Sequence, residues 1–165
     1  NRIYCTGHSM GCMMTHYLGS DEVSHRFAAM GATSGPLMAK EDTGTEIVPM
    51  FMTMAQYDMW SYDLQEDDTM TTQAVDMWLI RNGLATEETA AEVRKTGATE
   101  TYVDGRYNNS VWENDQGIPL FRYAWVTGKD HVNLPAENQL LWDEWFSQWE
   151  INADGVRSYQ GTPIQ

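Results

Sequence analysis

The sequence predicts an α/β domain in which a mostly parallel sheet is flanked by helices. Strand-like and helix-like segments alternate through the first half of the 165-residue chain, which is the pattern typical of such sheets. The run IVPMFMTMA at 47–55 is nearly continuously apolar, as in a parallel strand covered on both faces. The chain is long enough to bury one core, and it shows no internal repeat or domain boundary. We therefore expect a single domain over residues 1–165.

Two helices and three strands are predicted in the first half. The helical spacing of Met13, Met14 and Leu18 predicts the first helix, and Gly19 is a suitable residue to end it. An acidic, aromatic-rich loop at 57–68 precedes the second helix. In chain order, the predictions are a strand at 2–6, a helix at 10–18, a buried strand within 26–35, a charged loop at 40–46, a strand at 47–55 and a helix at 70–82.

The second half begins with a helix predicted over 86–97. Thr86 is a favourable N-cap residue for this helix. The first turn is acidic, and Arg94 and Lys95 lie in the last turn, so the charges match the helix dipole. These charges indicate a solvated helix rather than a binding site.

The remaining residues are expected to form strands and a closing helix. Strands are predicted within 99–127, and the sequence NDQG at 114–117 indicates a hairpin turn between the last two. After a loop at 128–135, a helix is predicted over 135–149, because proline suits a first helical turn. Large apolar residues recur in it every four positions, which favours core packing over an aromatic ligand platform. These residues are Leu141, Trp145 and Trp149. The tail beyond residue 150 is Gly-rich and polar.

Composition and charge exclude several classes of partner. A formal net charge of −14 repels polyanions, so nucleic acids and anionic membrane surfaces are unsuitable partners, whereas neutral substrates are compatible. The sequence holds no apolar run of membrane-spanning length and no secretory signal pattern. Cys5 and Cys12 are expected to be buried thiols rather than a disulfide pair. No His, Cys and Asp cluster has metal-ligand spacing, so no metal or organic cofactor is expected.

The pentapeptide Gly7-His8-Ser9-Met10-Gly11 lies between the first predicted strand and helix. In that position a G-x-S-x-G pattern predicts a nucleophile elbow, a strained turn that exposes the serine hydroxyl. Gly7 and Gly11 are expected to avoid side-chain collisions with the adjoining strand and helix. The backbone N–H of Met10 is expected to point toward a developing oxyanion. The alternative is that Ser9 lies in an ordinary strand–helix turn.

A nucleophilic serine needs a base, and the base needs an orienting carboxylate. With a nucleophile elbow the chain order is Ser, acid, His, and of the four histidines only His131 lies well downstream. An isolated loop histidine is commonly a surface residue, but the elbow favours His131 as the base. Asp58 follows the apolar run 47–55 by three residues, where the carboxyl end of a strand is expected, and it is favoured as the acid. The competing carboxylates lie deeper in the following loop or helix: Asp63, Asp67, Asp68 and Asp76.

Three segments resemble the polyhydroxybutyrate depolymerase-like esterases, an α/β-hydrolase group that includes feruloyl and acetylxylan esterases. RIYCTGHSMGCMMTHYL with SHRFAAMGATSG resembles the family's elbow region. VPMFMTMAQYD resembles its strand and acid turn, and YAWVTGKDHVNLP with the Trp-rich segment after it resembles its histidine loop and closing helix. The resemblance implies an α/β-hydrolase fold and places Asp58 and His131 in a triad with Ser9. It also implies a secreted or periplasmic protein.

The chain departs from the family pattern at three places. Met54-Ala55 stand where a His-Gly pair is common, and Cys12 stands where a second glycine is usual, which bears on the subfamily but not on the triad. Family members also carry several strands before the elbow, including the loop that supplies the second oxyanion N–H. The resemblance therefore implies that this chain is the C-terminal portion of a longer protein and lacks those strands and that loop.

The sequence thus predicts a serine esterase that hydrolyses polyester, feruloyl or acetyl esters, in small molecules or polymers, through an acyl-enzyme. Two alternatives stay open. One is a serine peptidase of the prolyl-oligopeptidase type, whose elbow and triad order are alike. The other is a noncatalytic or inactive fragment, because a shortened sheet would expose an apolar edge strand. Tyr57, Trp60 and Tyr62 are expected either to line an aromatic pocket near Asp58 or to form a packed loop. The sequence leaves the oligomeric state undetermined.

Overall fold

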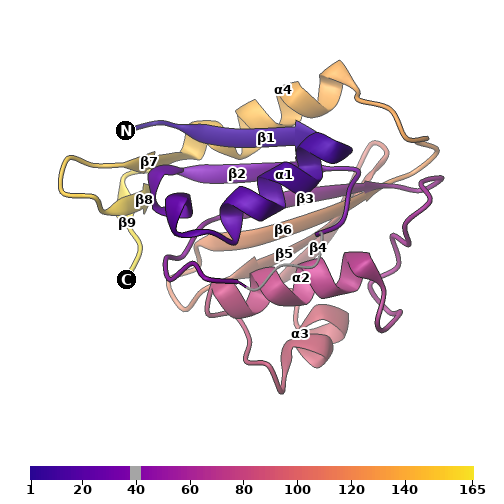
Figure 1. The fold of residues 1–165 in the computed structure, drawn as a ribbon, viewed down its shortest axis with the longest axis horizontal. Helices are drawn as coiled ribbons and strands as arrows, with labels where there is room; N and C mark the ends of the chain where they lie inside the picture. The colour runs from indigo at the N-terminus through magenta and orange to yellow at the C-terminus, as the bar shows by residue number, and fades with distance from the viewer. Residues whose placement is uncertain (38–41) are drawn as a thin grey trace.

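Within residues 1–37 and 42–165, which the computed structural model describes, six strands form one mixed sheet (Figure 1). The strand order is β1-β2-β3-β6-β5-β4. Neighbours from β1 to β6 in this order run parallel, whereas β5 and β4 are antiparallel additions. The bounds are β1 Tyr4–His8, β2 Ala29–Thr33, β3 Met50–Ala55, β4 Glu100–Asp104, β5 Tyr107–Glu113 and β6 Pro119–Val126. The predicted α/β class and mostly parallel sheet are confirmed. The first two residues of the predicted charged loop 40–46 lie outside the described residues.

Helices cover both faces of this sheet. In Figure 1, α1, α2 and α3 lie in front of the sheet and α4 lies behind it. The bounds are α1 Met10–Gly19, α2 Met70–Arg81, α3 Ala90–Thr96 and α4 Pro135–Glu144, with short 3₁₀ helices η1 Glu22–Arg26 and η2 Phe146–Gln148. None of the helices in the described part of the chain has the length and apolar character needed to cross a membrane.

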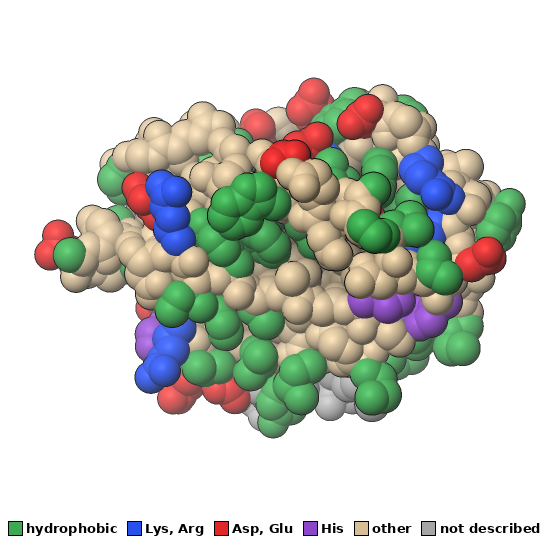
Figure 2. Space-filling view, turned by 90° about the horizontal axis from the view of Figure 1, so that it is seen from above, with side chains coloured by type: hydrophobic (Ala, Val, Ile, Leu, Met, Phe, Trp, Pro, Cys, Tyr) green, Lys and Arg blue, Asp and Glu red, His purple; other side chains and the backbone are tan. Residues whose placement is uncertain are grey.

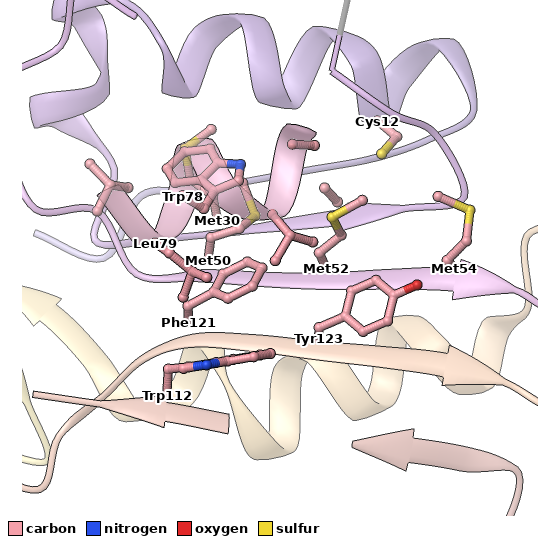
Figure 3. Close-up of a cluster of buried hydrophobic side chains, with 14 residues drawn as sticks. Cys12, Met30, Met50, Met52, Met54, Trp78, Leu79, Trp112, Phe121 and Tyr123 are labelled. Carbon is pink, nitrogen blue, oxygen red and sulfur yellow. The ribbon is translucent and has the colours of Figure 1, made fainter. Parts of the chain in front are cut away.

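The two faces of the sheet carry separate hydrophobic clusters. On one face, Met30, Met50 and Phe121 are register partners on neighbouring strands, and Trp78 of α2 packs against them (Figure 3). On the other face, Leu141 of α4 lies so close to the sheet that a Cβ at Gly31 would come within 2.8 Å of it. β1, β2, β3 and β6 run parallel, so their carboxyl ends share one edge of the sheet.

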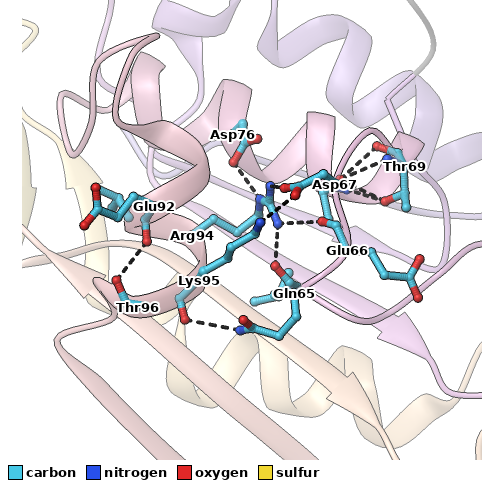
Figure 4. Close-up of polar contacts among 12 residues, drawn as sticks. Gln65, Glu66, Asp67, Thr69, Asp76, Glu92, Arg94, Lys95 and Thr96 are labelled. Atoms are coloured by element: carbon cyan, nitrogen blue, oxygen red, sulfur yellow. Dashed lines mark hydrogen bonds and ion pairs between the residues drawn. The ribbon is translucent and has the colours of Figure 1, made fainter.

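The helix predicted over 86–97 is shorter in the structure, and Arg94 in its last turn is buried. Thr86 and Thr89 bond each other in a turn, and α3 begins only at Ala90. Arg94 is 3% exposed, because the loop before α2 wraps around its guanidinium group. Its guanidinium donates to the carbonyl oxygens of Leu64 and Glu66 (Figure 4). The prediction of a solvated helix is therefore wrong at this residue.

The closing helix also ends earlier than predicted. It stops at Glu144, because Trp145 leaves the helical conformation (φ −130°, ψ −71°) and its indole N–H donates to the carbonyl oxygen of Met30 at 3.1 Å. The Gly-rich, polar tail contributes strands to a further sheet. A second, antiparallel sheet contains β7 Trp149–Ile151, β8 Arg157–Tyr159 and β9 Thr162–Pro163. Arg157 ties this small sheet to the main body through the carbonyl oxygens of Phe27 and Ile47.

Candidate active site

Ser9 occupies the turn between β1 and α1 in a strained backbone conformation. Its φ is 58° and its ψ is −120°, in the positive-φ region that non-glycine residues rarely adopt. Two backbone bonds hold this turn: the Ser9 N–H donates to the Thr33 carbonyl oxygen at 3.1 Å, and the Ser9 carbonyl oxygen accepts the N–H of Met13 at 3.1 Å. The serine hydroxyl is thereby fixed at the carboxyl end of β1.

The two elbow glycines have different structural roles. A Cβ at Gly7 would lie 2.2 Å from the carbonyl carbon of Gly11, so no larger residue fits there without moving the helix. A Cβ at Gly11 would meet nothing within 4 Å of it among the described residues. The prediction that both glycines avoid collisions is therefore confirmed for Gly7 and wrong for Gly11. The backbone of Gly11 faces the strand at Gly7, whereas a Cβ on Gly11 would meet no neighbouring atom in the described part of the chain.

Ser9, His131 and Asp58 are joined by a continuous chain of hydrogen bonds. The Nε2 atom of His131 lies 2.7 Å from the Ser9 hydroxyl oxygen, and its Nδ1 atom lies 2.9 Å from Oδ2 of Asp58. A neutral imidazole that donates its Nδ1 proton to a carboxylate leaves Nε2 free to accept the serine proton. The Asp58 side chain is fully buried, whereas the imidazole of His131 is 39% exposed. The structure therefore brings together the three side chains that the sequence analysis selected.

The topology explains why residues so far apart in sequence meet. Ser9 directly follows β1, Asp58 follows β3 by three residues, and His131 follows β6 by five. These strands are all part of the parallel region, so the three segments emerge at the same edge of the sheet.

The other carboxylates weighed as the acid have different partners. Asp67 and Asp76 both bond the guanidinium group of Arg94, and Lys95 also donates to Asp67 (Figure 4). Hydrogen bonds from Lys95 and Arg94 lower the pKa of Asp67. Asp63 accepts the backbone N–H of Gln65 within its own loop. Asp68 is exposed and has a φ of 58°. Among the described residues, the carboxylate that forms a hydrogen bond and ion pair with His131 is that of Asp58.

Met10 is the first residue of α1. The first hydrogen bond of the helix is donated by Met13 to Ser9, so the N–H of Met10 precedes the intrahelical ladder. An N–H at this position beside the nucleophile is suited to an oxyanion. Its role stays a prediction.

His8 adds a second imidazole to the site. Its ring centroid lies 4.9 Å from that of His131, and its Nδ1 atom lies 3.4 Å from the hydroxyl of Thr33. Burial, together with the charges of Lys129 and His131, lowers the pKa of His8. This shift favours the neutral form of His8, which reduces positive charge next to His131.

The three aromatic residues considered for a pocket or a packed loop differ in their contacts, although Trp60 and Tyr62 both pack against the hydrophobic cluster between α2 and the sheet. Trp60 packs edge-on against the imidazole of His131, with ring centroids 5.6 Å apart. Tyr62 instead packs in a tilted arrangement against Trp125, with ring centroids 5.0 Å apart, and lines a cleft of about 620 Å³ beside α3. Tyr57 is 64% exposed. Of the three, Trp60 is the residue in ring contact with the catalytic candidates.

The surface around the site is open and partly apolar. Figure 2 shows histidine side chains at the molecular surface with hydrophobic side chains next to them. Met10, Met59 and Val132, each adjacent in sequence to a triad candidate, are all exposed. The described residues contain no group of three His, Cys, Asp or Glu side chains arranged to hold a metal ion.

Sequence reasoning missed a buried charge pair under the site. Lys129 and Glu137 form an ion pair, and both side chains are fully buried. They lie two residues before and six residues after His131. Proximity to the predicted histidine was the available signal, but a lysine in a loop and a glutamate in the first turn of a helix normally indicate solvated charge.

No protein-family model matches this chain, and no curated protein matches it. A function for the chain is therefore argued from the geometry of the site.

Proposed function

We propose that the chain is a serine esterase with an α/β-hydrolase fold, of the polyhydroxybutyrate depolymerase-like kind. The observation that carries the proposal is the chain of hydrogen bonds from Asp58 through His131 to Ser9. The strained elbow and the shared carboxyl edge of the parallel strands support it, because both are features of serine hydrolases built on such sheets.

The proposed reaction follows from the positions of these atoms. The Ser9 hydroxyl oxygen attacks the ester carbonyl carbon as Nε2 of His131 takes the hydroxyl proton. The carboxylate of Asp58 accepts a hydrogen bond from the Nδ1–H group of His131 and stabilises the imidazolium that forms. The N–H of Met10 donates to the developing oxyanion. Proton return from Nε2 releases the alcohol, and water then hydrolyses the acyl-Ser9 bond with His131 again acting as base.

The electrostatics of the chain favour uncharged substrates. With a formal net charge of −14, the protein repels anions, whereas carboxylic esters of polymers or aromatic acids are neutral at the reacting bond. The exposed apolar side chains of Met10, Met59 and Val132 are compatible with a bulky ester.

The test compares a p-nitrophenyl ester with the corresponding p-nitroanilide in the full-length protein. We expect the ester to be hydrolysed with an initial burst of about one equivalent of p-nitrophenolate, because acylation of Ser9 precedes deacylation. The anilide is expected to be a far poorer substrate. Preferential turnover of the anilide would assign the chain to the peptidase alternative, and no turnover of either would contradict catalysis by this site.

A further inference from the structure

The buried pair of Lys129 and Glu137 connects the His131 loop to the rest of the site. The Lys129 ammonium group donates to the carboxylate of Glu137 and, at 3.1 Å, to the hydroxyl of Ser34. Glu137 lies in the first turn of α4 and also accepts the hydroxyl proton of Thr53 at 2.8 Å. Through these hydrogen bonds the pair connects the His131 loop to β3, to α4 and to Ser34, which follows β2.

The backbone of Lys129 makes a further connection, to the loop of the catalytic acid. Its carbonyl oxygen accepts the N–H of Tyr57 at 2.9 Å, and Tyr57 directly precedes Asp58. Ser34, which the ammonium group contacts, has a φ of 54° and donates its own N–H to the Thr53 carbonyl oxygen at 2.9 Å. Lys129 thus bonds both the acid loop and the end of the strand next to the elbow.

The burial of this pair is an argument for a specific role. Removing two charges from water carries a large desolvation penalty, and apolar residues of similar volume commonly give an equally stable core. The presence of charged residues there is explained if they fix one geometry of the His131 loop. Each of the two side chains forms directional hydrogen bonds, Lys129 to Ser34 and Glu137 to Thr53. His131 itself is held by less packing, because its imidazole is 39% exposed.

We propose that Lys129 and Glu137 are positioning residues that fix the His131 loop so that Nε2 faces the Ser9 hydroxyl. This inference rests on the proposed function, and it adds two residues that touch neither the substrate nor the reacting atoms.

The test removes both charges together, with the double variant Lys129→Met/Glu137→Leu in the full-length protein. Removing both avoids an unpaired buried charge, so we expect the fold to be kept. We expect kcat for a p-nitrophenyl ester to fall about 10–100-fold with little change in KM, because displacing a catalytic group by about 1 Å can cost about 100-fold. The matched control is Arg122→Met/Glu144→Leu, which removes an ion pair between the same helix, α4, and the sheet. It is expected to change kcat less than about twofold.

A second readout separates this inference from the proposed function. The Nδ1 proton of His131, bonded to Asp58, is followed by proton NMR in the wild type and in both double variants. We expect its resonance to weaken or shift only in the Lys129→Met/Glu137→Leu protein. A folded double variant with unchanged kcat and an unchanged resonance overturns the positioning role. A wild-type protein without esterase activity overturns the proposed function, and the resonance then decides the positioning role alone.

If the double variant does not fold, Thr53→Val tests the same positioning role. This substitution removes one hydrogen bond to Glu137 and keeps the side-chain volume and the ion pair. We expect kcat about fivefold below that of the wild type, as for the loss of one supporting hydrogen bond. An unchanged kcat together with an unchanged His131 resonance overturns the proposal.

Discussion

Replacing Ser9 with alanine is expected to lower kcat for an aryl ester by about 10⁶-fold, the scale seen when a serine nucleophile is removed from a hydrolase triad. The loss is this large because no other group can form the acyl-enzyme. Alanine keeps a Cβ at the same strained backbone position, so the melting temperature is expected to change by less than about 2 °C. Steady-state kinetics and thermal unfolding of the full-length protein provide the measurement.

The matched control for this variant is Ser110→Ala. Ser110 is a half-buried serine in β5, outside the hydrogen-bonded chain of the site. It is expected to keep kcat within about twofold of the wild type. If Ser9→Ala retained a substantial part of the activity, the nucleophile would be a different residue.

Replacing Asp58 with asparagine is expected to lower kcat by about 10⁴-fold with the fold preserved. An asparagine amide can donate to Nδ1 of His131, which stabilises the tautomer with its proton on Nε2. That tautomer cannot accept the proton of Ser9, although the geometry of the three residues is unchanged. The carboxylate is fully buried beside the imidazole, so water cannot replace it readily.

Asp63→Asn is the control for Asp58→Asn, because Asp63 lies in the same loop and its hydrogen bonds within the described part of the chain are to neighbours in that loop. We expect kcat/KM for the control to stay within about twofold of the wild type. Comparable losses in the two variants would show that loop charge, rather than histidine orientation, determines the rate.

The catalytic candidates could be predicted from sequence because each follows a recognisable strand. The apolar run that became β3 indicated where Asp58 should lie, and the β-like segment before residue 128 did the same for His131. The carboxyl ends of parallel strands share one edge, so strand assignment, together with the elbow motif and the chain order Ser, acid, His, predicted that these residues converge on Ser9.

The features that sequence reasoning missed all depend on burial in the folded chain. The sequence pattern around Arg94, at the end of α3, is that of a solvated helix terminus. In the folded chain, however, the loop before α2 encloses Arg94 and buries it. Trp145 continued the helical spacing, but its indole N–H bonds the sheet and the helix ends there. The pairing of Lys129 with Glu137 inside the protein follows from tertiary packing, which local patterns do not encode.

The most direct test of the central claim is covalent labelling with a fluorophosphonate, which reacts with serine hydroxyls activated by a neighbouring base. Tryptic mass spectrometry of the full-length protein is expected to find the adduct on Ser9. Labelling should be much slower in His131→Ala and unchanged in His25→Ala, since the His25 imidazole bonds its own 3₁₀ helix, η1. An unmodified Ser9, or equal labelling in both histidine variants, would contradict the account.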